Sequence, residues 1–245
     1  SAEKLEKYIT DKTKVILYSS PCNPSGAVYN YDELKAIAEL LKKYPKIHAI
    51  SDEIYEHIVY SGTYHSLAEF EEVKDRVILV NGFSKAYAMT GWRLGFLATS
   101  TEIASACDKI QGQITSGTCN FNQMAAIEAL DGSQEKVKFM VEQFKSRRAL
   151  VLNRLKELDG VKCPEPDGAF YVFPDMRTYF GKSSEGITIN DSEDLAMYLL
   201  EEANVAVVGG KSFGDANCIR ISFAASEEMI NKAFDRIKKA LEKLT

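Results

Sequence analysis

The residues with the clearest chemical potential are Lys85 and Arg93, which lie in one short run, Ser84–Arg93. This run follows the apolar segment Val77–Val80, typical of a buried strand, after the turn-forming pair Asn81-Gly82. A lysine just beyond a buried strand can lose part of its solvent shell, and a desolvated amine is a better nucleophile. Arg93 carries a planar fork of donors suited to a phosphate group. A covalently reactive lysine with a phosphate clamp nearby is what a pyridoxal phosphate site requires.

Three further segments bring polar side chains next to apolar, strand-like runs. They are Ser20–Gly26, Ser51–His57 and Cys218–Ala224. The first two come directly after short apolar segments, and the third lies close to the C-terminal end.

Each of these segments also has an ordinary structural interpretation. Asn23-Pro24-Ser25-Gly26 is a good turn sequence without any ligand. Asp52 could cap a helix, with Tyr55 packed nearby. Arg220, inside an apolar strand, could belong to a structural ion pair. The occurrence of all four segments in one chain, in this order, favours a common chemical role.

In this order the four segments resemble those of the fold type I, class I aminotransferases, which depend on pyridoxal phosphate (PLP), and the resemblance runs along the whole chain. It implies that Lys85 forms the internal aldimine with the cofactor and later moves a proton between the substrate Cα and cofactor C4′. Asp52 matches the carboxylate that faces the pyridine nitrogen and keeps it protonated. Asn23 and Tyr55 match the pair that hydrogen-bonds the phenolate oxygen of the ring.

The resemblance also implies how the phosphate and the substrate are bound. Arg93 matches the phosphate-binding arginine. Arg220 matches the arginine that holds the substrate α-carboxylate in a bidentate contact, with Asn23 beside it. Gly82 stands where some relatives place a phosphate-binding serine, and Ser84 is expected to take over that contact.

The order of elements predicts an α/β fold. We expect the second half of a PLP-transferase large domain in residues 1–132, a mostly parallel sheet with flanking helices. A small α+β C-terminal domain is expected in residues 133–245, entered through a long helix at Ser133–Leu158. The other expected strands are Val15–Tyr18, Ile47–Ile50, Val77–Val80, Leu94–Ala98, Gly168–Phe173, Val205–Val208 and Ile219–Phe223. The other expected helices are Tyr31–Tyr44, Glu102–Ile114, Asn122–Leu130, Ser192–Ala203 and Glu227–Leu244.

Composition argues against several other classes of protein. The formal net charge is −5, which does not favour nucleic acid or an anionic membrane as a partner. No run approaches the roughly 20 apolar residues of a membrane span, and no signal-peptide pattern opens the chain, so a cytoplasmic location is expected. The three histidines and five scattered cysteines suggest neither a metal site nor a disulfide framework.

The position of Lys85 indicates that these residues are a C-terminal portion of a longer enzyme. The resembled family carries this lysine well past the middle of its chain. A phosphate-binding turn, an aromatic residue stacked on the cofactor ring and a tyrosine from a dimer partner would then precede residue 1. We expect the intact protein to be a homodimeric aminotransferase and the isolated 245 residues to be inactive.

The expected reaction passes an amino group from an L-amino acid to a 2-oxo acid such as 2-oxoglutarate. Aspartate is the favoured donor, because Thr90–Arg93 resembles the bacterial aspartate aminotransferase branch. Aromatic and alanine transaminases share these motifs. One alternative is a PLP-dependent carbon–sulfur lyase, which uses the same constellation. The other, of a different class, is a PLP-sensing transcription regulator, in which an aminotransferase-like domain follows a helix-turn-helix.

Overall fold

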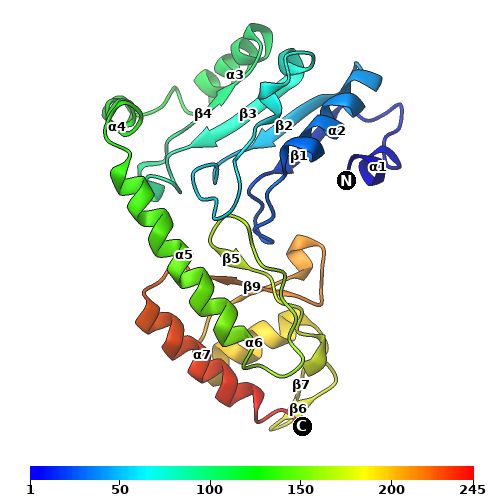
Figure 1. Ribbon diagram of the computed structural model, residues 1–245, viewed down its shortest axis with the longest axis vertical. Coiled ribbons are helices and arrows are strands. Elements are labelled where there is room, and N and C mark those ends of the chain that lie inside the picture. Colours follow the sequence, from blue (N-terminus) through cyan, green and yellow to red (C-terminus); the bar gives the residue numbers. More distant parts are fainter. The chain divides into compact units, whose positions relative to one another are not determined.

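The structure is a computed structural model that describes residues 1–245. The chain divides into two compact units. Unit 1 comprises residues 1–22 and 27–139, and unit 2 comprises residues 23–26 and 140–245. Helix α5 (Glu135–Leu155) begins in unit 1 and continues in unit 2 (Figure 1). The functional boundary expected after residue 132 stays a prediction.

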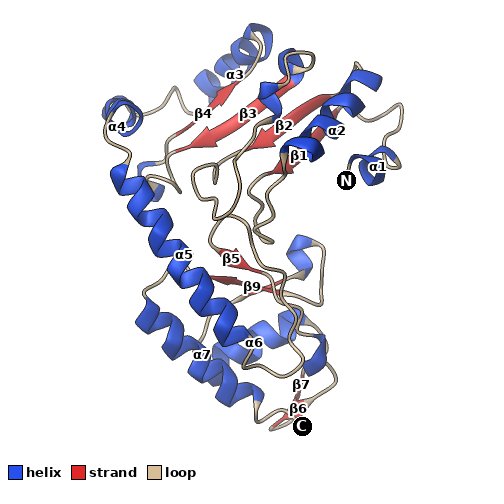
Figure 2. Cartoon of the chain, in the orientation of Figure 1, coloured by secondary structure: helices blue, strands red, loops and turns tan.

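Unit 1 is built on one four-stranded sheet with the order β1-β2-β3-β4 (Figure 2). The strands are β1 (Val15–Ser19), β2 (His48–Asp52), β3 (Val77–Gly82) and β4 (Gly95–Ala98). The first three strands run parallel, and β4 pairs with β3 in the antiparallel direction. Because parallel strands end at the same edge of a sheet, the segments that follow β1, β2 and β3 leave from one edge. The predicted mostly parallel sheet is confirmed.

Helix α2 (Tyr31–Lys43) covers one face of this sheet. Asn30 and Glu33 form a capping box at its first turn, which satisfies backbone donors that a helix start leaves unpaired. Its apolar side chains pack in one core cluster with residues of the three parallel strands. That cluster includes Leu34, Ile37, Ala38, Leu41, Ile16, Ala49 and Val77.

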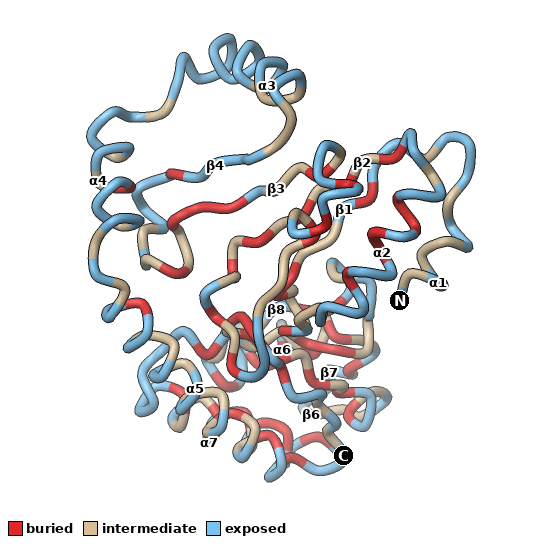
Figure 3. The backbone as a smooth tube through the Cα atoms, turned by 45° about the horizontal axis from the view of Figure 1, so that its top comes forward, coloured by how far each residue is buried: buried red, intermediate tan, exposed pale blue.

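The alternate side chains of β1 point to the other face and are exposed. Val15 and Leu17 are 45% and 69% exposed, although they flank the buried Ile16. Helices α3 (Thr101–Ile114) and α4 (Asn120–Asp131) are also exposed over most of their length, as is β4 (Figure 3). Parallel sheets are normally covered on both faces, so much of unit 1's apolar surface has no cover within this chain.

Unit 2 is a small α+β unit. Its main sheet has the order β5-β9-β8, formed by β5 (Tyr171–Val172), β9 (Ile219–Ser222) and β8 (Val208–Gly209). All pairings in this sheet are antiparallel. Helices α6 (Ser192–Ala203) and α7 (Glu227–Leu241) each bury one face in the apolar core. A short hairpin, β6 (Ser183–Ser184) with β7 (Ile187–Thr188), completes the unit.

The strands of unit 2 are shorter than the sequence pattern predicts. Only Tyr171–Val172 of the expected strand Gly168–Phe173 forms a ladder, because Ala169 has a φ of +56° and breaks the extended backbone. The expected strand Val205–Val208 begins only at Val208, since Val205 still donates to the Leu199 carbonyl at the end of α6.

The structure also contains short elements that the sequence analysis did not predict. The short helix α1 (Ala2–Glu6) and the β6–β7 hairpin were not predicted. The single-turn 3₁₀ helices are Leu67–Glu69, Lys74–Arg76, Thr90–Trp92, Arg177–Tyr179 and Lys211–Phe213. None of the helices combines the length and apolar character needed to cross a membrane.

Candidate functional site

The sheet edge of unit 1 gathers the predicted catalytic segments. Asp52 is the last residue of β2 and pairs in register with Ser19 of β1 and Val80 of β3. Strand β3 then ends at Gly82, three residues before Lys85. The parallel order of the strands therefore brings Asp52 and the lysine turn to the same edge.

Asp52 opens a turn and caps no helix. Its Oδ1 accepts a hydrogen bond from the Ile54 backbone N–H at 3.2 Å. The backbone N–H of Glu53 continues the sheet pattern by donating to the Val80 carbonyl at 2.8 Å. The helix-cap interpretation of Asp52 is thus wrong, and the side chain is held at the strand end by its own turn.

Tyr55 and Lys85 lie close together. Tyr55 is buried, with 3% of its surface exposed, and the Lys85 Nζ lies 5.8 Å from the centre of its ring. Lys85 is half-buried in a turn closed by the Ala88 N–H, which donates to the Lys85 carbonyl at 3.1 Å. The geometry places an amine next to a phenol ring, at the edge where Asp52 emerges.

The loop from Ser84 to Arg93 is folded on itself by side-chain contacts. The Thr90 hydroxyl donates to the Ser84 carbonyl at 2.9 Å, and the Arg93 guanidinium donates to the Thr90 carbonyl at 3.0 Å. Arg93 adopts a left-handed backbone with φ of +53°, a conformation that costs energy for a residue with a side chain. Arg93 is exposed, so its other donors face solvent.

Gly82 is required by the close approach of two strands. A Cβ at this position would lie 2.9 Å from both the Gly95 Cα and the Leu94 carbonyl oxygen. These are backbone atoms that cannot swing aside. A serine therefore does not fit at position 82 without moving β4. Ser84 precedes Lys85 directly in the sequence and supplies a hydroxyl on the same turn.

Glu53 is a buried carboxylate beside Asp52 that the sequence analysis did not single out. Only 1% of its surface is exposed. Its Oε1 accepts hydrogen bonds from the Ser51 hydroxyl at 2.8 Å and the Ser66 hydroxyl at 2.7 Å. Burial raises the pKa of Glu53 above its ordinary value, and these hydroxyl bonds oppose the rise. Glu53 thus ties the Asp52–Tyr55 turn to the segment at Ser66.

In unit 2, Arg220 and Asn23 are joined directly. Arg220 lies on β9, and its Nη1 donates to the Asn23 Oδ1 at 2.9 Å. Its guanidinium carbon lies over the Tyr171 ring at 4.7 Å and over the Phe213 ring at 4.9 Å. Arg220 forms no ion pair in the structure, so the structural ion-pair interpretation of this residue is wrong.

Asn23 is positioned by a turn anchored within unit 2. The Gly26 carbonyl accepts from the backbone N–H groups of Asp167 and Gly168 at 2.9 and 2.8 Å. Gly26 has a φ of +70°, and a Cβ there would lie 2.2 Å from the Pro166 Cβ. Glycine is therefore needed at this close crossing, which fixes the four residues Asn23–Gly26 against the segment leading into β5.

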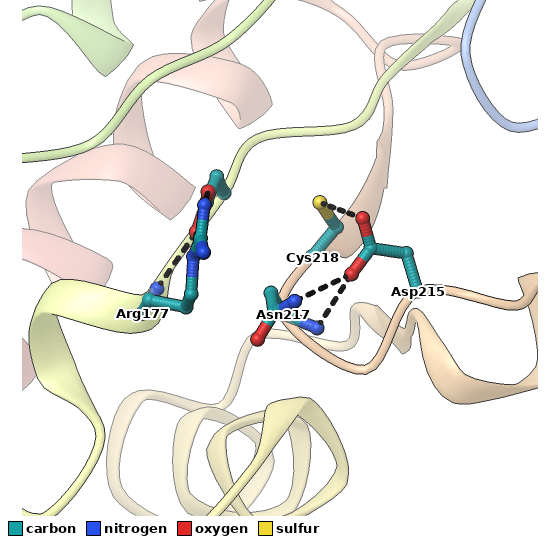
Figure 4. Close-up of polar contacts among 5 residues, drawn as sticks. Arg177, Asp215, Asn217 and Cys218 are labelled. Atoms are coloured by element: carbon teal, nitrogen blue, oxygen red, sulfur yellow. Dashed lines mark hydrogen bonds and ion pairs between the residues drawn. The ribbon is translucent and has the colours of Figure 1, made fainter.

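The turn before β9 is also ordered by local hydrogen bonds. The Asp215 Oδ1 accepts from the backbone N–H and the side-chain amide of Asn217 at 3.0 and 2.9 Å (Figure 4). The Cys218 thiol donates to the other carboxylate oxygen of Asp215 at 3.6 Å. Nearby, Arg177 forms an ion pair with Asp175. The contacts of Asp215 order the turn that leads into β9, the strand that carries Arg220. The sequence analysis identified none of these contacts.

The predicted site residues thus fall into two sets. Asp52, Tyr55, Ser84, Lys85 and Arg93 belong to unit 1, and Asn23 and Arg220 belong to unit 2. Within the sets, the structure brings Lys85 to Tyr55 and Arg220 to Asn23. The roles assigned to these seven residues stay predictions.

A mixed, mostly parallel sheet with flanking helices, followed by a small α+β unit, is the fold class of the PLP-dependent transferases. Comparison with known proteins narrows this class. Residues 1–237 match the model of the family described as aminotransferase class I and II. The chain belongs to this family.

Two of the similar proteins are named as aminotransferases. The chain is 47% identical over 242 residues to a bifunctional aspartate aminotransferase and glutamate/aspartate-prephenate aminotransferase of Petunia hybrida, covering 97% of the chain and 50% of that protein. It is 46% identical to a probable aspartate/prephenate aminotransferase of Rickettsia felis, covering 98% of the chain and 59% of the relative.

Solved structures agree with these relatives. An aspartate aminotransferase from Rhizobium meliloti matches with a TM-score of 0.95 and 42% identity, over 100% of this chain and 62% of that one. The Thermus thermophilus aspartate aminotransferase with maleate matches with a TM-score of 0.87 and 36% identity, over 98% and 60%. The chain thus spans about half to three-fifths of the length of the relatives it matches.

Proposed function

We propose that the intact protein is a PLP-dependent aminotransferase. The observation that carries this proposal is the Lys85 amine beside the buried Tyr55 ring, at the sheet edge where Asp52 emerges. Family membership supports the same conclusion. The proposal covers the whole protein, of which this chain is the part that holds these residues.

The residues present fit this cofactor. Only one oxygen of Asp52 is engaged by its own turn, through Ile54, so the carboxylate can also pair with a pyridinium nitrogen. Exposed donors of Arg93, with the hydroxyl of Ser84, suit a phosphate group. Lys85 lies where it could form the covalent link, and Tyr55 and Asn23 would hydrogen-bond the phenolate oxygen. When bound, PLP supplies an electron sink that stabilises negative charge at the substrate Cα.

The protein's own residues would do the remaining work. Asp52 would hold a proton on the pyridine nitrogen, because a fixed negative charge beside that nitrogen favours its protonated form. The Lys85 amine would act as general base when it removes the proton from the substrate Cα. It would then act as general acid and donate a proton to C4′ of the cofactor. Arg220 would bind the α-carboxylate and so fix the orientation of the Cα–H bond.

We propose aspartate as the amino donor and 2-oxoglutarate as an acceptor. The relatives named above support aspartate, and their names add prephenate as an amino-group acceptor to be tested. We further propose that the intact enzyme is cytoplasmic and forms a homodimer. A mass measurement by light scattering would test the dimer.

Assay of the full-length protein tests the reaction. Aspartate should donate to 2-oxoglutarate with formation of glutamate, and aspartate or glutamate with prephenate is the second arm of the assay. Release of pyruvate, ammonia and a thiol from a sulfur amino acid, without amino transfer, would contradict the proposal and favour the carbon–sulfur lyase. Absence of both reactions would favour the regulator.

A further inference from the structure

Arg220 is held by aromatic rings from two different elements. Its guanidinium carbon lies 4.7 Å from the Tyr171 ring centre and 4.9 Å from the Phe213 ring centre. The face of an aromatic ring attracts a cation, and more strongly where water is excluded. Arg220 has no carboxylate partner, and its Nε is buried without a hydrogen-bond acceptor. The rings and the Asn23 amide oxygen are therefore the contacts that hold this positive charge.

Tyr171 reaches Arg220 through the register of the sheet. Tyr171 of β5 lies opposite Ser222 of β9, and Arg220 precedes Ser222 by two residues on the same strand. Residues two apart on a strand share a face, so Tyr171 and Arg220 are diagonal neighbours across the pair, within reach of long side chains. Tyr171 is buried, which limits the positions its ring can take.

Phe213 reaches Arg220 through a loop fastened to helix α6. Its N–H donates to the Gly210 carbonyl at 2.9 Å. The Gly210 N–H donates to the Ser192 hydroxyl at 3.0 Å, and the Lys211 N–H donates to the Glu193 carboxylate at 3.1 Å. Both partners lie in the first turn of α6, so the loop that carries Phe213 has a fixed anchor.

A third ring supports Phe213 from the side. Phe173 meets Phe213 edge-on, with ring centres 6.0 Å apart and planes at 87°. This geometry is a favoured one for aromatic pairs. The anchored loop thus sets the position of Phe213, and Phe173 packs against one side of its ring.

We propose that Tyr171 and Phe213 are positioning residues, which we call the guanidinium clamp. Their ring faces hold the Arg220 guanidinium in one orientation before substrate arrives, and this raises its affinity for a carboxylate. An arginine side chain with several rotatable bonds loses conformational freedom when it binds an anion. The clamp imposes this loss of conformational freedom when the protein folds. The loss therefore does not weaken the binding of a carboxylate. The inference rests on the proposed function only in naming the substrate α-carboxylate as the ligand.

Binding of maleate, an unreactive dicarboxylate, to the full-length PLP-loaded protein tests the clamp by calorimetry. Phe213→Leu removes the ring and keeps an apolar side chain, and should weaken maleate binding roughly two- to tenfold, the cost of ordering one long side chain. Phe213→Tyr and Tyr171→Phe keep a ring at each position and should stay within about twofold of the wild type.

Phe173→Leu is the matched control, because it removes a ring that contacts Phe213 and leaves the rings over Arg220 in place. Its effect on maleate binding should be smaller than that of Phe213→Leu. The absorbance of the bound cofactor and its reaction with hydroxylamine, an amine without a carboxylate, should be the same in all variants. This readout separates loss of carboxylate binding from general damage to the site.

Equal losses in Phe213→Leu and Phe173→Leu, unchanged binding in Phe213→Leu, or no maleate binding by the wild type would overturn the clamp. A wild type without cofactor absorbance or amino transfer would instead contradict the proposed function. In that case, weaker maleate binding in Phe213→Leu than in Phe173→Leu would still support the clamp, and equal binding would still overturn it.

Discussion

Lys85 and Tyr55 illustrate how much of the chemistry depends on single side chains. The Lys85 amine lies 5.8 Å from the Tyr55 ring centre, in a turn that directly follows a strand of the parallel sheet. No other lysine occurs between Lys74 and Lys109, so none nearby in sequence could replace it.

We expect Lys85→Ala in the full-length protein to lose amino transfer by at least roughly 10²-fold, the usual contribution of a general acid–base residue. The variant should still bind PLP through its phosphate and ring contacts. Borohydride treatment followed by peptide mapping should label Lys85 in the wild type and no lysine in the variant. Labelling of a different lysine in the wild type would show that the central assignment is wrong.

Asp52 and Asn23 should differ in the kinetic parameter that they affect. Asp52→Asn removes the charge that holds a proton on the cofactor, so kcat should fall by at least roughly one to two decades, from a charged hydrogen bond worth about 1.5–3 kcal/mol. Asn23 accepts from Arg220 at 2.9 Å. Asn23→Ala should therefore mainly raise KM for amino acids, by roughly tenfold or less. Steady-state kinetics with several donors separates the two, and equal losses of kcat would argue against this division.

At the scale of elements, β2 and the turn that follows it depend on the buried Glu53. Its Oε1 accepts from two hydroxyls, those of Ser51 and Ser66. A carboxylate with 1% of its surface exposed is costly to keep charged, and burial raises the pKa of Glu53 above its ordinary value of 4.5.

The raised pKa of Glu53 predicts a pH dependence of stability. The folded protein holds this proton more tightly than the unfolded chain does. The free energy of unfolding should therefore fall as pH rises from near 4.5 to the raised pKa of the folded state. Glu53→Gln has no such proton and keeps an oxygen for both serines, so it should lose this component. Glu53→Leu removes the shared acceptor of both hydroxyls, which keep their contacts with the Tyr18 hydroxyl and the Ala68 N–H, and should cost about 1–3 kcal/mol in total.

Urea unfolding across a pH series measures both effects. Glu39→Gln, on the exposed side of α2, is the matched control and should leave the pH dependence of the wild type unchanged. An identical pH dependence in wild type and Glu53→Gln would mean that another group is responsible.

The elements themselves were largely predictable from sequence, because apolar runs and caps are local signals. Helix α6 matches its predicted bounds of Ser192–Ala203, and β3 begins at the predicted Val77. The contacts that refine the site are not local. Arg220 meets Asn23, 197 positions away, and Tyr171 meets Arg220 only through the pairing of β5 with β9. Glu53 carries no sequence signal beyond its place beside Asp52, since one of its two hydroxyl partners lies 13 residues further on.

At the scale of the whole molecule, the exposed apolar side chains of unit 1 are the main feature. Leu17 of β1 is 69% exposed and Phe121 of α4 is 73% exposed. Phe96 and Leu97 on β4 are also exposed. Large apolar surfaces of this kind mark sites of association, and parallel sheets are normally covered on both faces.

We expect the 245 residues on their own to self-associate and to lack amino transfer between aspartate and 2-oxoglutarate. The physical reason is that the uncovered face of the sheet binds other apolar surface, while a catalytic site that lacks several preorganised contacts loses a few kcal/mol for each. Light scattering coupled to size exclusion measures association, and a dye that binds apolar surface reports exposure. Leu17→Lys should reduce association, because it places a charge on the exposed face of β1, whereas Glu39→Lys on α2 should not. A monomer that binds no dye would show that this apolar surface needs no cover. Turnover of aspartate by that monomer would show that the 245 residues form a complete catalytic site.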